Sequence, residues 1–254
     1  IRDVYKVTCV YPEKALLDKK LQSLFKFVIT LKGAVSRNFS VHARQGKVDV
    51  LGVTQSTNVV LENGVVSLKN TSGNFNINVV QGTIEAQKHN GKLRADLFEG
   101  KMMLNQVDGT LDLTNFNGTS SLKTLTGDIS YNSHNGVMNI EGSQGSLKFD
   151  SDAGKLDIAS FNGSIDGSSD QAQIFAKLAN PAKFRAKIKN ATVRLSVPSN
   201  SGAQIYLALN EGQFQVPGYL SQDNYGAVKT AKGTLRGGES GRISVTGEAG
   251  KVIV

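Results

Sequence analysis

Glycine recurs every nine residues through the middle of the chain, and this spacing constrains the fold more than any other feature. The nine-residue grid from residue 46 to residue 163 has fourteen positions, and only Gln55 is not glycine. A fixed internal period of this kind indicates a repeat architecture, in which each unit packs against its neighbours. The glycines stand at positions 46, 64, 73, 82, 91, 100, 109, 118, 127, 136, 145, 154 and 163.

Apolar residues follow each glycine at the second and fourth places, as in Val48 with Val50 and Val66 with Leu68. Two side chains at this spacing lie on the same face of a strand, and the residues between them face solvent. Each nine-residue unit is therefore predicted to contain one strand and one corner. Asn or Asp often precedes the glycine, a pair typical of a tight corner with positive φ, so we assign the glycine to the corner. The exceptions in the apolar series are Thr57, Ser120 and Gly167.

A nine-residue unit of this kind buries one side only, so two units are expected to face each other across a thin core. This predicts an all-β fold, a parallel β-solenoid with about 18 residues per coil, as the regular structure of residues 45–170. A meander of antiparallel hairpins is the alternative, although hairpins rarely keep so constant a period.

The two flanks of the repeat are expected to differ from it. In residues 1–44, Leu17, Leu21 and Leu24 recur at helical spacing after Pro12, which predicts an amphipathic helix over residues 14–24. With strands near 4–10 and 25–31, this helix is expected to cap the first coil; an independent surface helix is the alternative. Residues 171–254 are expected to form wider, basic coils that continue the solenoid, because the phase returns at Gly241 and Gly250.

The glycine-phased run, an apolar strand that ends at Pro198, the Gly202-Ala203 pair and the final Gly250-Lys-Val-Ile-Val resemble the bacterial adhesin family of β-solenoid repeat domains. The resemblance covers residues 40–254. It implies an exported protein, in the periplasm, at the outer membrane surface or outside the cell, and it brings no catalytic signature. No apolar run is long enough to form a transmembrane segment.

Few residues suggest chemistry. Cys9 is the only cysteine, so we expect neither an internal disulfide nor a cysteine-rich metal site. His89 and His134 share a repeat phase but are 45 residues apart, an odd number of units, so they are expected to face opposite sides. We interpret these two residues and His42 as surface or corner residues rather than ligands or bases.

Acidic pairs, such as Asp150 with Asp152 and Asp108 with Asp112, raise the possibility of a polysaccharide-active enzyme on a β-helix. Solvent-facing strand positions explain the same pairs, and the absence of tryptophan weakens a sugar-stacking groove. We therefore predict a protein that is not an enzyme, with no metal and no cofactor.

One segment stands out by its charge. The net charge of +8 is divided into +6 for residues 1–44, −5 for 45–170 and +7 for 171–254. Lys183, Arg185, Lys187 and Lys189 alternate with apolar residues, so on a strand all four point the same way. This row is the candidate binding site for an anionic glycan or envelope polymer. Nucleic acid is not expected because no aromatic platform accompanies the charges; a solvated strand protected from aggregation is the alternative.

The sequence thus favours a non-catalytic exported or cell-envelope protein, an adhesin or an envelope-binding module. A structural scaffold that assembles through the ends of the solenoid is the main alternative.

Overall fold

The protein is all-β, and the strands of its described residues form a curled and mostly parallel sheet of fourteen strands. The computed structural model describes residues 5–7, 27–32, 38–179, 181, 183–236 and 241–254. The strands are β1 (Tyr5–Val7), β2 (Phe27–Lys32), β3 (Phe39–Leu51), β4 (Thr57–Glu141), β5 (Gln144–Ser169), β6 (Gln173–Leu178), β7 (Lys183–Lys189), β8 (Thr192–Ser196), β9 (Ala203–Asn210), β10 (Gln213–Gln215), β11 (Ser221–Tyr225), β12 (Val228–Leu235), β13 (Gly241–Glu248) and β14 (Lys251–Ile253).

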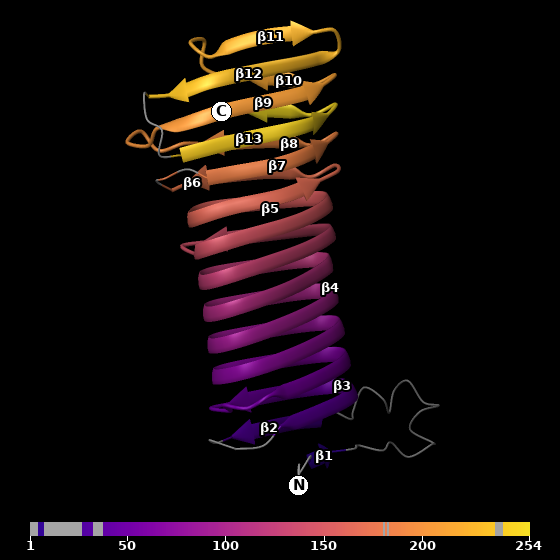
Figure 1. Ribbon diagram of the computed structural model, residues 1–254. Helices are drawn as coiled ribbons and strands as arrows, with labels where there is room; N and C mark the ends of the chain where they lie inside the picture. Colours follow the sequence, from indigo (N-terminus) through magenta and orange to yellow (C-terminus); the bar gives the residue numbers. More distant parts are fainter. Residues whose placement is uncertain (1–4, 8–26, 33–37, 180, 182, 237–240) are drawn as a thin grey trace, which may run out of the picture.

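The glycine-phased part of the chain pairs with itself in parallel. Gly46 lies opposite Gly64 where β3 meets β4, and Gly127 lies opposite Gly145 where β4 meets β5, so paired residues are eighteen apart. Figure 1 shows the ribbon of β3 to β5 winding in successive turns along one axis. The alternative of antiparallel hairpins is therefore wrong for this part of the chain.

At the N-terminal end, β1 and β2 both pair in parallel with β3, opposite residues 39–41 and 46–51 respectively. The helix expected over residues 14–24 lies outside the described residues. Within the described part of the chain there is no helix that is long and apolar enough to cross a membrane.

Beyond β5 the sheet continues as two arms. The first arm runs through β6, β8, β14 and β10, and the second runs through β7, β13, β9, β12 and β11. Residues 241–254 therefore lie inside the sheet: β13 is placed between β7 and β9, and β14 between β8 and β10 (Figure 1). The glycine spacing returns at Gly241, but the strands that follow do not add to the end of the sheet. They lie between strands formed by residues 171–236. A pair of antiparallel strands, β12 and β11, ends the second arm instead.

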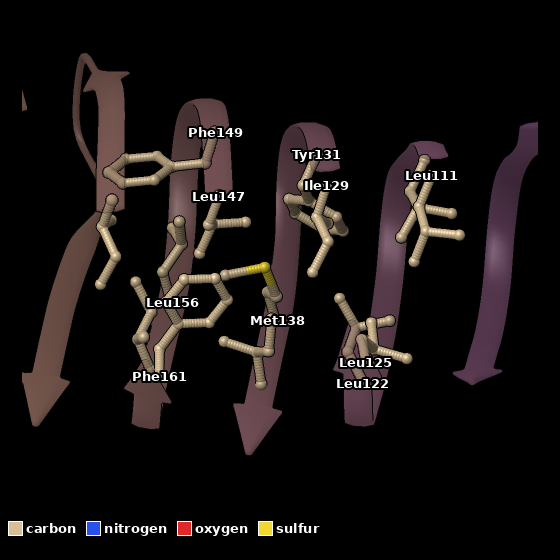
Figure 2. Packing of buried hydrophobic residues seen from close by; sticks show 14 of the residues in the cluster. Leu111, Leu122, Leu125, Ile129, Tyr131, Met138, Leu147, Phe149, Leu156 and Phe161 are labelled. Atoms are coloured by element: carbon tan, nitrogen blue, oxygen red, sulfur yellow. The ribbon is translucent and has the colours of Figure 1, made fainter. Parts of the chain in front are cut away.

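The core is a thin apolar layer enclosed by the winding sheet. Figure 2 shows two rows of side chains that point toward each other, one with Ile129 and Tyr131 and the other with Met138 and Leu156. These four residues are all buried. The lapse in the apolar series at Gly167 has a steric reason, because a Cβ there would lie 2.4 Å from the Phe149 ring.

The phase glycines also lie where consecutive strands approach each other closely. Most of them have positive φ, as the sequence predicted, for example 140° at Gly64 and 147° at Gly82, and at these two an added Cβ would lie within 2 Å of the carbonyl oxygen eighteen residues earlier. Glycine is required there because consecutive strands approach each other closely.

One corner of each eighteen-residue stretch is made six residues after alternate glycines. Seven residues at this place have φ between 52° and 68°, in the left-handed region, and five of them are not glycine. They are Gly52, Asn70, Lys88, Gln106, Thr124, Gly142 and Ser160.

Candidate anion-binding face

β7 presents the predicted basic row on the outside of the sheet. Lys183, Arg185, Lys187 and Lys189 are exposed, whereas the three residues between them are buried in the core. The alternation arises because successive side chains of a strand point to opposite faces. The four cations therefore form one outward row, named here the β7 row.

The neighbouring strands give this row a mixed setting. On β5, Ser164, Asp166 and Ser168 lie opposite Lys183, Arg185 and Lys187. On β13, Arg242, Ser244, Thr246 and Glu248 lie opposite the four residues of the row in order.

Only one residue of the row has an ion pair with a described residue. Arg185 Nη1 is 3.6 Å from Asp166 Oδ2, and both side chains are more than half exposed, so the pair contributes little to stability. Lys189 lies opposite Glu248 in register. Lys183 and Lys187 have hydroxyl groups opposite them on β5, so their charge is not neutralised by that strand.

A groove of about 550 Å³ lies at the Lys183 end of the row. Its polar rim comes from both sides of β7 and contains four cations and one carboxylate. The small side chains of Ser146 and Ser164 keep the groove open between the longer side chains of the rim. The outward residues of the rim are Ser146, Lys148, Ser164, Asp166, Lys183, Arg185, Gln204, Arg242 and Ser244.

Arg242 is one of the groove residues that the sequence did not indicate. It lies directly opposite Lys183 because β13 is inserted beside β7. Lys148 and Gln204 were missed for a related reason, since they reach the groove from β5 and β9. The one available signal was that Arg242 follows Gly241, an outward place in the returning phase.

The three histidines have different surroundings. His89 is 1% exposed, so it is not a surface residue, although it follows the corner residue Lys88, and its Nδ1 lies 3.0 Å from Thr71 Oγ1. Burial lowers the pKa of His89 to about 4. His134 is exposed, stacks on Phe116 and lies 2.8 Å from Asp152 Oδ2. His42, also exposed, approaches Asn58.

One of the two acidic pairs, Asp150 with Asp152, contacts neighbouring side chains. Asp150 accepts a hydrogen bond from Ser168, and Asp152 Oδ2 lies 2.8 Å from His134 Nδ1. Among the described residues, no group of three His, Cys, Asp or Glu side chains is arranged to hold a metal ion.

Comparison with protein-family models, curated proteins and solved structures finds no significant match to this chain. The resemblance to bacterial adhesins therefore stays a prediction.

Proposed function

We propose that this chain is a non-catalytic β-solenoid module that binds acidic polymers through the β7 row. The proposed ligands are anionic glycans or phosphate-bearing polymers of a cell envelope, and the proposed location is outside the cytoplasm. The winding is proposed to be a solenoid with 18 residues per coil. The eighteen-residue parallel register of β3, β4 and β5 supports this description.

The observation that carries the binding proposal is the alignment of cations across β7 and β13. Four exposed cations stand about two residues apart on one strand, and Arg242 adds a fifth on the next strand. A strand rises about 3.3 Å per residue, so the row offers a positive charge roughly every 6.6 Å. A regular spacing of this kind favours a flexible polyanion, whose successive charged groups can be bound along the row.

A scaffold that assembles through strand edges is a second candidate, since β10 and β11 each have one neighbouring strand in the sheet path. These edges are short, with three and five residues, and four of the five residues of β11 are polar. Short polar edges oppose strand addition by another chain. Binding by the β7 row is therefore the better supported function.

The test measures binding of the chain to a soluble acidic polysaccharide and to a polyphosphate by biolayer interferometry at several salt concentrations. A variant with Lys183, Arg185, Lys187 and Lys189 all replaced by Gln should bind at least tenfold more weakly. Added salt should weaken binding of the unmodified chain, because screening acts on the exposed charges.

A matched control removes four other exposed lysines, all from the part of the sheet that leads into the first arm. Replacing Lys69, Lys101, Lys123 and Lys155 by Gln changes the net charge by the same amount. Equal weakening by both quadruple variants would show that only total charge matters, and the β7 row would lose its assigned role. Absence of binding to either polymer would reject the proposed function.

A further inference from the structure

We propose that the groove beside Lys183 and Arg242 binds one acidic sugar unit, by an oxyanion and its neighbouring hydroxyl groups. This inference rests on the proposed function and deepens it, because it assigns one specific site within a face that otherwise acts by summed charge. The shared ligand chemistry is an oxyanion on a hydroxylated ring, whether a carboxylate, a sulfate or a phosphate.

The groove places two positive charges next to each other. Lys183 and Arg242 lie directly opposite on adjacent strands, and no acidic side chain among the described residues makes an ion pair with either. Like charges in this position destabilise a sheet. Binding of an anion between them would relieve the repulsion, and the planar guanidinium of Arg242 is suited to hold two oxygens of one group.

The single carboxylate of the groove does not cancel this charge. Asp166 is paired with Arg185, which leaves Lys148, Lys183 and Arg242 without an acidic partner among the described residues. The anion is therefore expected at Lys183 and Arg242, away from the Asp166 carboxylate.

The remaining polar groups of the groove suit the hydroxyls of a sugar. Ser164 lies beside Lys183 on β5, and Gln204 lies beside Arg242 on β9. Ser146 donates its hydroxyl hydrogen to Asp128 at 2.6 Å, so its oxygen remains as an acceptor. Hydroxyl and amide groups both donate and accept hydrogen bonds, as sugar hydroxyls require.

The groove ends within the row, which separates it from the rest of the face. It is lined by Lys183 and Arg185 but not by Lys187 or Lys189. Binding of a single acidic sugar should therefore depend on the groove, whereas a long polymer should also bind to the rest of the β7 row.

The experiment titrates the full chain with glucuronate, glucose 6-sulfate and glucose 6-phosphate, with glucose as the neutral reference, and follows backbone amide shifts by NMR. The double variant K183Q/R242Q should weaken binding of an acidic sugar at least tenfold. The variant K101Q/K155Q has the same change of charge away from the groove and should change the affinity less than twofold. A third variant, Ser164→Leu, fills the hollow without changing charge and should also weaken binding at least tenfold. The acidic sugar that binds most tightly identifies the oxyanion.

Three outcomes would overturn the assignment: no shift with any acidic sugar, an equal loss in both double variants, or normal binding by Ser164→Leu. The polymer test separates this failure from failure of the proposed function. If the chain binds acidic polymers in a salt-dependent manner but none of the three sugars, only the groove assignment is wrong. If it binds neither, the proposed function fails as well.

Discussion

A Cβ atom on Gly100 would lie 1.9 Å from the carbonyl oxygen of Gly82, eighteen residues earlier in the chain. The same approach occurs at Gly82 over Gly64 and at Gly109 over Gly91, also at 1.9 Å. A carbon atom cannot occupy this position, so the backbone of consecutive strands must separate before any side chain fits. The glycine period is thus a condition for close stacking of the chain on itself.

Replacing Gly100 by Ala should therefore destabilise the protein by about 3 kcal/mol or more, as an overpacked site with no flexible neighbour. Gly142 provides a matched control, because a Cβ there meets no atom within 4 Å although φ is 59°. Gly142→Ala should cost only the strain of the left-handed backbone, about 1 kcal/mol. Urea unfolding of the two variants measures the difference, and equal costs would show that backbone conformation, rather than stacking, requires glycine at position 100.

Thr124 has a β-branched side chain at φ 53°, a conformation that such residues rarely adopt. Gly52 and Gly142 occupy the same corner position at φ 68° and 59°, so glycine fits this backbone. Thr124→Gly should stabilise the protein by about 1 kcal/mol, since relief of the left-handed strain exceeds the entropy cost of glycine. Thr114→Gly, within β4 and without positive φ, should instead destabilise it by a similar amount. A lower melting temperature for Thr124→Gly would contradict the assigned strain.

His89 makes stability depend on pH. Its ring is buried and contacts Phe75 edge to face. Burial disfavours the charged imidazolium, so the pKa falls from 6.5 to about 4 in the folded protein. Between these values the unfolded chain binds a proton that the folded chain does not. Stability contributed by neutral His89 is therefore complete above pH 6.5 and is lost as the pH falls to about 4, by about 3 kcal/mol.

The test compares urea unfolding at pH 7 and pH 4.5 in the unmodified chain and in a double variant, Thr71→Val with His89→Leu. Val53, Val107 and Leu125 are buried at equivalent places, so apolar side chains suit this column. The double variant should lose less stability on acidification, whereas His42→Gln, at an exposed position, should behave as the unmodified chain. The same acid sensitivity in the double variant would assign the pH dependence to other groups.

Local repetition made the central sheet predictable, while the long-range order of the last strands did not follow from it. A nine-residue period with two apolar places already implies pairing of residues eighteen apart, as Gly46 with Gly64. The nine-residue period does not show which of the two corners in an eighteen-residue stretch has the left-handed backbone. That corner position holds residues as different as Asn70, Lys88 and Thr124. For this reason the burial of His89 was missed.

Only part of the candidate site could be predicted, because only part of it follows from a local sequence pattern. Alternation along residues 183–189 is a local property, and the exposed row on β7 follows from it. The position of Arg242 depends on which strand lies beside β7, and residues 203–235 intervene in the chain. Sequence distance carries no information about such an insertion when β7, β9 and β13 share the same alternation of buried and outward residues.

The insertion of β13 between β7 and β9 makes a prediction about which cysteines can form a disulfide. Thr246 lies opposite Lys187 on one side and opposite Ala208 on the other. Adjacent strands are about 4.8 Å apart, within the Cα separation of a disulfide, whereas two strand spacings exceed it. In a Cys9→Ser background, the pair Lys187→Cys and Thr246→Cys should therefore oxidise to a bridge. The pair Lys187→Cys and Ala208→Cys should stay reduced, and peptide mass spectrometry with thiol counting measures both. A bridge in the second pair and not in the first would place β9, rather than β13, beside β7, and would remove Arg242 from the groove.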